Sequence, residues 1–142
     1  MEYPANNPYV RRLVVQPADI DAQGHVSNVK ILDWMNQAAI EHSDALGYDV
    51  ARYREIGGIF VVKRHEIDYL ASAYEGEALI QFTWPSGARR SGAERKHEIR
   101  READGAVIAC GLNHWVYVDI ETGRPKRMPP EVLAAFDPAK FV

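Results

Sequence analysis

The residues best suited to chemistry lie in one short stretch, Asp19–Asn28. It holds a carboxylate at Asp21, a glycine at Gly24 and an imidazole at His25, and a segment with helical periodicity follows it. Backbone N–H groups at a helix start have no partner within the helix and lie at the positive end of its dipole. A carboxylate beside them can direct water, or itself, at a carbonyl group whose oxygen the N–H groups polarise. The stretch therefore predicts acyl-transfer chemistry.

The segment after this stretch must position it. Apolar residues over Val29–Leu46 recur at spacings of three and four, the pattern of an amphipathic helix with one buried stripe. Ser27 or Asn28 is suited to cap the helix start, and Gly47 to end it. Such a helix is roughly 27 Å long, about the width of a small domain.

Five other segments are predicted as strands and one as a short helix. The strands are rich in alternating apolar and β-branched residues, and turn sequences such as Asp104-Gly105 separate them. Pro85-Ser86-Gly87 is expected to break the chain after one strand. The strands are expected over Tyr9–Val15, Ile59–Tyr69, Glu77–Trp84, Ser91–Arg101 and Ala106–Asp119, and the helix over Pro130–Phe136.

One long helix and five antiparallel strands make an α+β fold in which the helix lies on one face of the sheet. A single sheet of this size leaves apolar surface and at least one strand edge exposed, and a second copy of the chain can cover both. We therefore expect a single domain over residues 1–142 that forms a homodimer.

The composition argues against several classes of protein. The 142 residues suffice for one hydrophobic core, and the net charge of −3 gives no general argument for nucleic-acid binding. No apolar run is long enough to span a bilayer, and the first residues lack the features of a signal peptide. Cys110 is the only cysteine, so no internal disulfide is expected and a cytoplasmic location is the default.

The stretch Asp19–Asn28, with a long helix directly after it, resembles the signature of hotdog-fold acyl thioesterases. It is similar to that of the 4-hydroxybenzoyl-CoA thioesterase family and of the related plant acyl-ACP thioesterases. Glu66–Leu70 resembles the family's second strand and Trp115–Asp119 its last strand, and the resemblance covers Tyr9–Phe136.

This resemblance implies a fold, an activity and an assembly. The fold is a long central helix wrapped by a five-stranded antiparallel sheet. The activity is hydrolysis of an acyl thioester, with acyl-CoA as the first candidate substrate. The assembly is a homodimer with active sites at the subunit interface, commonly paired into a dimer of dimers.

The resemblance also assigns catalytic roles. Asp21 matches the catalytic carboxylate, which acts as general base for water or as a nucleophile. Gly24 permits a tight turn, and the backbone N–H of Asn28 aligns with the amide that polarises the substrate carbonyl. Asp19 is expected to order the loop, and Glu41 on the helix to be a solvated or interface residue.

His25 resembles the histidine of the plant branch, where it takes part in catalysis. Two neighbours depart from that branch's pattern, namely Gln23 and Ser27. His25 is therefore expected to position water, to hydrogen-bond Asp21 or to line the pocket.

Substrate contacts are expected from two further groups of residues. Arg89 and Arg90 lie in a basic stretch that the family often places against the phosphates of coenzyme A, frequently across the dimer. The competing interpretation is a solvated strand face. Trp34, Phe60 and Tyr69 are expected to contribute to the acyl pocket, with core packing as the alternative for Trp34.

No metal site and no cofactor are expected, and coenzyme A enters only as part of the substrate. His65, His97 and His114 lack partners at metal-ligand spacing. Strand alternation also places Arg95 and His97 on the face where relatives usually carry apolar residues.

Three alternatives to an acyl-CoA thioesterase stand beside this interpretation. In the first, the carrier of the acyl group is an acyl-carrier protein. A hotdog dehydratase would need a different histidine motif with following prolines, which is absent. A hotdog protein that binds acyl-CoA without catalysis would not need the Asp21–Gly24 arrangement.

Overall fold

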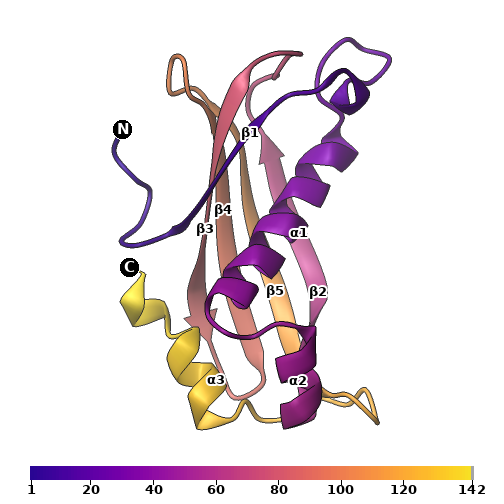
Figure 1. The fold of residues 1–142 in the computed structure, drawn as a ribbon, viewed down its shortest axis with the longest axis vertical. Helices are drawn as coiled ribbons and strands as arrows, with labels where there is room; N and C mark the ends of the chain where they lie inside the picture. Colours follow the sequence, from indigo (N-terminus) through magenta and orange to yellow (C-terminus); the bar gives the residue numbers. More distant parts are fainter. Residues whose placement is uncertain (142) are drawn as a thin grey trace.

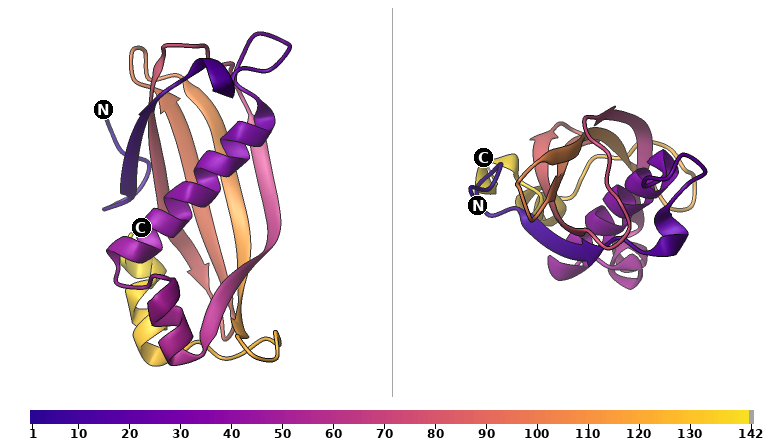
Figure 2. Two further views of the ribbon diagram at one scale, coloured as in Figure 1. Left: turned by 45° about the vertical axis from the view of Figure 1, so that its right-hand side comes forward. Right: turned by 90° about the horizontal axis from the view of Figure 1, so that it is seen from above.

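The structure is a computed structural model and describes residues 1–141. Its central element is the helix α1 (Asn28–Ala45), which crosses one face of a curved five-stranded sheet (Figure 1). Seen from above, the sheet curls around this helix (Figure 2). The predicted α+β arrangement is therefore confirmed.

Every pair of neighbouring strands in the sheet is antiparallel, and the strand order is β1-β3-β4-β5-β2. The strands are β1 (Tyr9–Val14), β2 (Gly58–Tyr69), β3 (Ala78–Ala88), β4 (Gly92–Arg101) and β5 (Val107–Asp119). The edge strand β2 is 12 residues long, and no strand within residues 1–141 pairs with its outer side.

Four shorter helical segments complete the chain. They are the 3-10 turn η1 (Pro17–Asp19), α2 (Val50–Ile56), α3 (Pro130–Ala135) and the 3-10 turn η2 (Pro138–Lys140). The helix α2 was not predicted from the sequence, although both of its ends carry standard capping signals. Asp49 accepts a hydrogen bond from the Arg52 N–H at 2.8 Å, and Gly57 ends the helix with a φ of +79°. None of the helices in residues 1–141 combines the length and apolarity needed to cross a membrane.

The main core lies between α1 and the sheet. Trp34 and Met35 on α1 are buried against side chains from the strands and from the loop before α1. The members of this cluster are Val15, Val26, Ile31, Trp34, Met35, Ala73, Leu79, Ile99, Ile108 and Ala109. A second cluster joins α2, α3 and Tyr117 at the other end of the sheet.

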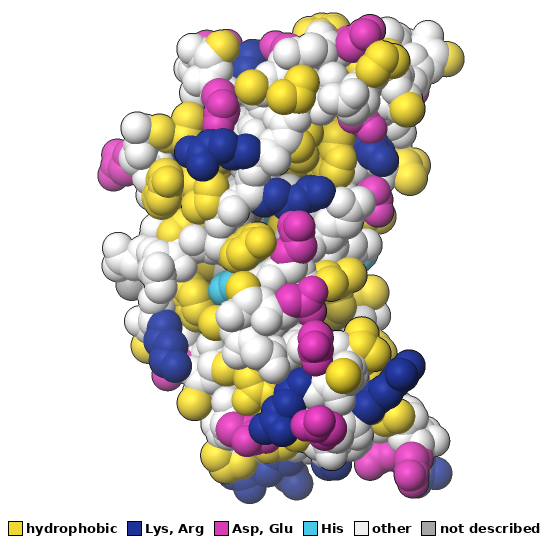
Figure 3. Space-filling model, in the orientation of Figure 1, with side chains coloured by type: hydrophobic (Ala, Val, Ile, Leu, Met, Phe, Trp, Pro, Cys, Tyr) yellow, Lys and Arg dark blue, Asp and Glu magenta, His cyan; other side chains and the backbone are white. Residues whose placement is uncertain are grey.

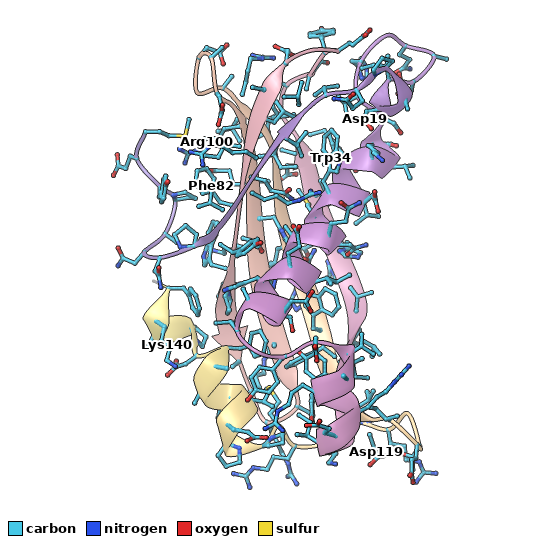
Figure 4. The ribbon with its side chains drawn as sticks, in the orientation of Figure 1. Asp19, Trp34, Phe82, Arg100, Asp119 and Lys140 are labelled. Atoms are coloured by element: carbon cyan, nitrogen blue, oxygen red, sulfur yellow. The ribbon has the colours of Figure 1, made fainter. Side chains whose placement is uncertain are left out.

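The two chain ends cover the opposite face of β3. Ile80, Phe82 and Trp84 are buried there, and Phe141 packs against them. Arg100 lies over the ring of Phe82, with its guanidinium carbon 5.1 Å from the ring centre (Figure 4). This face of the sheet is therefore partly closed within one chain.

The expected break at Pro85 is wrong, because β3 continues through Pro85, Ser86 and Gly87. Pro85 pairs with Arg95, and the register with β4 shifts between Pro85 and Gly87. A bulge accommodates a proline inside a sheet, because one residue there makes no regular ladder hydrogen bond.

Gly58 at the start of β2 provides a test of this packing. A Cβ at this position would overlap the ring of the buried Tyr117. We expect Gly58→Ala to lower the free energy of unfolding by about 1–3 kcal/mol, measured by urea denaturation. Gly92→Ala is the control, since its Cβ would meet only the Trp115 carbonyl oxygen at 4.0 Å. Equal unfolding midpoints for the two variants would contradict the packing described.

Candidate active site

The loop around Asp21 is a tight turn closed by its own hydrogen bonds. The Asp21 N–H donates to the His25 carbonyl oxygen, and the Gly24 N–H donates to the Asp21 carbonyl oxygen, both at 3.0 Å. Gly24 has a φ of +87°, which favours a residue without Cβ. The Asp21 Oδ1 atom accepts a hydrogen bond from the Gln23 N–H at 2.8 Å. These contacts orient the carboxylate and leave its Oδ2 atom without a hydrogen bond to any described residue.

Asp19 ties this loop to the rest of the chain. Its Oδ2 accepts a hydrogen bond from the Gln16 N–H at 2.8 Å, and its Oδ1 lies 3.5 Å from Lys30 Nζ. Its carbonyl oxygen accepts a hydrogen bond from the Ser27 N–H at 3.0 Å. The buried Asp19 therefore orders the loop, as predicted.

The start of α1 presents an available backbone amide. Ser27 is the N-cap, and its Oγ accepts a hydrogen bond from the Val29 N–H at 3.2 Å. Asn28 is the first helical residue, and its own N–H donates to no acceptor within residues 1–141. This amide lies at the positive end of the helix dipole, where a developing negative charge on oxygen is stabilised.

A pocket of about 660 Å³ brings these groups together. Asp21, His25 and Asn28 line it, and Tyr69 from the end of β2 closes it. The Tyr69 hydroxyl donates to the Asn28 carbonyl oxygen at 3.4 Å. The remaining lining residues are Ala22, Gln23, Val26, Ile31, Leu70, Ala71, Ser72 and Ala73.

His25 contributes a defined tautomer. Its Nδ1 lies 3.1 Å from the Val26 carbonyl oxygen. A carbonyl oxygen only accepts hydrogen bonds, so this contact requires the proton on Nδ1 and leaves Nε2 of the neutral ring as an acceptor. His25 thus lines the same pocket as Asp21, and its Nε2 has no hydrogen-bond partner among the described residues.

Other residues proposed for the site lie outside this pocket. Trp34 is 4% exposed and packs in the main core, and it lines none of the described pockets. Gly24 shapes the loop but is not among the residues lining the pocket. Glu41 forms an ion pair with Arg11 at 2.9 Å and is half-exposed, as expected for a solvated residue.

Phe60 lines a second, mainly apolar cavity of about 300 Å³. Its walls come from the C-terminal half of α1, from α2 and from the starts of β2 and β4. Tyr48, Tyr53 and Phe136 contribute aromatic rings, and Arg95 contributes a buried guanidinium. The sequence analysis did not find this cavity, because its lining residues are far apart along the chain.

Arg89 and Arg90 line a third pocket, together with Arg127. Arg89 forms an ion pair with Glu94 at 3.2 Å, while its side chain remains 76% exposed. A backbone hydrogen bond holds the segment of Arg127 beside that of Arg89 and Arg90, since the Met128 N–H donates to the Arg90 carbonyl oxygen at 3.0 Å. Arg127 is a basic residue that the sequence analysis missed, because it follows an irregular segment with no periodic signal.

The Asp21 pocket and the other two pockets lie at opposite ends of the molecule. The loop before α1, marked by Asp19, is at the upper end, while the turn between β3 and β4 lies beside α3 at the lower end (Figures 1 and 4). In the space-filling view, Lys and Arg side chains are also found at this lower tip (Figure 3). Within one chain, Arg89 and Arg90 are therefore remote from Asp21.

A row of buried polar side chains runs under α1. Arg95 and His97 face the helix, as strand alternation predicted, and are 7% and 2% exposed. Arg95 Nη1 donates to His42 Nδ1 at 2.9 Å and to Thr83 Oγ1 at 3.1 Å. His97 Nε2 bonds the Asn113 side-chain oxygen. These contacts explain how a buried strand face can carry polar side chains here.

Burial sets the charge of these groups. Burial is the larger cause and the nearby positive charge of Arg95 the smaller one, and together they lower the pKa of His42 to about 3. The pKa of His97 is lowered to about 3 by the same two causes. Both rings are therefore neutral at neutral pH, and His42 can accept the hydrogen bond from the guanidinium. No group of three His, Cys, Asp or Glu side chains in residues 1–141 is arranged to hold a metal ion.

Comparison with known protein families identifies the family of this chain. The model of the thioesterase-like superfamily matches residues 15–136, which include the Asp21 loop, α1 and all strands from β2 to β5. The chain belongs to this superfamily. The protein is thus a thioesterase, an enzyme that hydrolyses acyl thioesters, as the sequence motif predicted. No match was found among the curated proteins.

Solved structures show that the thioesterase has the hotdog fold. A 1,4-dihydroxy-2-naphthoyl-CoA thioesterase from Synechocystis is 18% identical with a TM-score of 0.82, and the match covers 92% of this chain and 96% of that one. A Staphylococcus aureus protein solved in complex with CoA is 10% identical with a TM-score of 0.85, covering 95% and 85%. A 12:0-ACP thioesterase from Umbellularia californica is 17% identical with a TM-score of 0.82, and the match covers 93% of this chain and 50% of that one.

The buried histidines of the thioesterase make its stability depend on pH. Because their pKa is lower in the folded chain than the ordinary value of 6.5, the unfolded chain binds protons first as pH falls. The contribution of the two neutral histidines to the free energy of unfolding is complete above pH 6.5 and is lost progressively as the pH falls toward 3. We expect the urea midpoint to be lower at about pH 4.5 than at about pH 7.5.

Removing one of these histidines tests the cause. His97→Gln should reduce the difference between the two midpoints, while His114→Gln, at a partly exposed position, should leave it unchanged. An identical pH dependence in the wild type and both variants would contradict this origin of the acid sensitivity.

Proposed function

We propose that the enzyme hydrolyses acyl-CoA to a carboxylate and free CoA, with Asp21 as the reacting carboxylate. The observation that carries this assignment is the shared pocket of Asp21 and the Asn28 amide. Asp21 presents an oxygen without a hydrogen bond to a described residue, and the amide presents a donor without an acceptor. Base and oxyanion donor therefore face one space, as acyl transfer requires.

In the general-base form of the reaction, Asp21 takes a proton from water as the water oxygen attacks the thioester carbon. The carbonyl oxygen gains negative charge, which the Asn28 N–H and the helix dipole stabilise. Collapse of the intermediate breaks the C–S bond, and the thiolate of CoA takes up a proton. In the alternative form the Asp21 carboxylate attacks the thioester carbon directly, the C–S bond breaks and the CoA thiolate leaves and takes up a proton. Water then hydrolyses the mixed anhydride, which releases the carboxylate product and restores Asp21.

The proposed carrier is coenzyme A, and the basic pocket supports it. Arg89, Arg90 and Arg127 together offer planar donors suited to phosphate groups. The structure of the similar Staphylococcus aureus protein holds CoA. An acyl-carrier protein is the second candidate, because one similar structure is an acyl-ACP thioesterase. Steady-state kinetics with one acyl chain on both carriers discriminate between them.

The assembly we propose is a homodimer formed by two β2 edges. The outer side of β2 has no strand partner in residues 1–141, and it carries the exposed Val61 and Val62. A strand that pairs with its own copy about a two-fold axis places its start beside the partner's end. The resulting sheet would contain both chains, and two such dimers can associate as the family resemblance implies.

This pairing of β2 strands would also bring together pockets that lie far apart within one chain. The end of β2, at Tyr69, borders the Asp21 pocket, and the start of β2, at Ile59 and Phe60, borders the apolar cavity. In the proposed dimer the Asp21 pocket of one chain therefore faces the apolar cavity of the other, and the basic pocket lies at that same end of the other chain (Figure 1). One substrate can then contact all three.

Replacement of Asp21 tests the chemistry. We expect Asp21→Asn to fold normally and to lower kcat at least about 100-fold, because the amide neither accepts a proton at neutral pH nor attacks a carbonyl. The measurement is release of free thiol from a panel of aliphatic and aryl acyl-CoAs. Asp33→Asn, on the first half of α1, is the matched control. Wild-type-like turnover by Asp21→Asn would exclude this role, and absence of release from every wild-type substrate would favour a binding protein.

Mixing two defective variants tests the composite site. One variant is Asp21→Asn, and the other carries Arg90→Glu and Arg127→Glu. If each site takes its carboxylate from one chain and its arginines from the other, exchanged heterodimers regain one intact site in two. We expect the equimolar mixture to recover about a quarter of the wild-type activity.

The control is each variant mixed with itself, which should recover nothing. A mixture that stays inactive although mass spectrometry detects heterodimers would show that both groups act within one chain.

A further inference from the structure

The mainly apolar cavity at Phe60 has one positively charged side chain in its wall. Of its lining residues, most are apolar or aromatic, and Arg95 is the only Lys or Arg among them. An apolar wall suits the hydrocarbon part of an acyl group. A guanidinium in the same wall suits a group of opposite charge.

Arg95 has no counter-ion within residues 1–141. None of the described carboxylates forms an ion pair with it, and its two side-chain partners, His42 and Thr83, are neutral. Both partners are bonded to Nη1, so Nε and Nη2 have no hydrogen-bond acceptor among the described residues. Burying a charge without an opposite charge is costly, and an arriving anion would offset that cost.

Two carboxylates line the same cavity without neutralising Arg95. Asp44 is exposed near the C-terminal end of α1. Glu94 is already engaged, because its carboxylate lies 3.2 Å from Arg89 and 3.5 Å from His114 Nδ1. The positive charge of Arg95 therefore remains available at the buried part of the wall. Burial lowers the pKa of Arg95 only to about 10, so the side chain is charged at neutral pH.

The dimer of the proposed function brings this cavity to the reacting end of the substrate. Ile59 and Phe60 line the cavity and lie at the start of β2, which then lies beside the end of the partner's β2. An acyl group bound at Asp21 of one chain thus extends toward Arg95 of the other.

We infer that Arg95 is a specificity-determining residue and that the preferred acyl group carries a carboxylate at its far end. The inference rests on the proposed function, because it names the substrate class of that same site. The hydrocarbon part of the acyl group packs against Phe60, Tyr48 and Phe136, and the terminal carboxylate accepts hydrogen bonds from the free guanidinium donors.

The test compares two acyl-CoAs of equal chain length, octanoyl-CoA and its ω-carboxyl counterpart suberoyl-CoA. We expect the wild type to have a kcat/KM about 10- to 100-fold higher for the ω-carboxyl substrate, since a charged hydrogen bond replaces an unpaired buried donor. Arg95→Met should remove this preference mainly by lowering kcat/KM for suberoyl-CoA. Arg95→Lys should retain part of it, because it keeps the positive charge.

Lys96→Met is the matched control, since Lys96 is adjacent on β4 but exposed. It should leave the preference unchanged. Equal or better hydrolysis of octanoyl-CoA by the wild type would overturn the inference, whether or not Arg95→Met folds. So would an Arg95→Met variant that loses the same factor on both substrates, because that result indicates a purely structural role.

Binding to the Asp21→Asn variant separates this inference from the proposed function. Calorimetric titration with suberate and with octanoate should show tighter binding of the dicarboxylate, and Arg95→Met should abolish the difference. If this preference holds while neither thioester is hydrolysed by the wild type, the proposed function fails and the role of Arg95 stands. If hydrolysis proceeds without any preference in either assay, the reverse is true.

Discussion

The length of α1 is the constraint on which the rest of the structure depends. A helix of 18 residues is roughly 27 Å long, so the groups at its start are separated by that length from those at its end as it crosses the sheet (Figure 1). The Asp21 loop precedes the first residue of α1, whereas the apolar cavity surrounds its last turns. A single chain holds the two rigidly but apart. Only an arrangement that reverses the direction of a second chain can bring them together.

The polar residues under α1 are a second consequence of this design. A core of aliphatic side chains would be the simplest support for the helix. Over part of the sheet, polar side chains replace that aliphatic core. Arg95 is bonded to His42 and Thr83, and His97 is bonded to Asn113. The neutral His42 accepts a hydrogen bond from the Arg95 guanidinium, so no carboxylate is needed to hold that side chain. A charge can thus be kept in the interior and still be available to a ligand.

The part of the site that could be predicted from the sequence is the part with local signals. Asp21, Gly24 and the cap at Ser27 lie within seven consecutive residues, and turn and cap preferences act over that range. The helix and four of the strands follow from periodicity for the same reason. The strand through Pro85 was not predictable, because the partner strand and its bulge decide whether a proline is tolerated.

The parts that escaped prediction depend on distant contacts. Phe60 was expected to line an acyl pocket formed by two subunits, and only tertiary packing shows that within one chain it lies near the opposite end of α1 from Asp21. Trp34 has the chemistry of a pocket wall and the spacing of a core residue, and only the packing shows that it is core. Arg127 joins Arg89 and Arg90 through a backbone hydrogen bond between Met128 and Arg90. No local sequence signal carries that information.

An irregularity in β2 bears on the two-fold assembly proposed above. The pairing with β5 shifts between Val62 and Arg64, leaving Lys63 as an extra residue. Phe60 before it and Ile67 after it both pack inward, although strict alternation would point them to opposite faces. In a strand that pairs with its own copy, this bulge occurs twice, once in each chain. The two bulges would permit one register between the chains and would thereby fix the distance between their Asp21 loops.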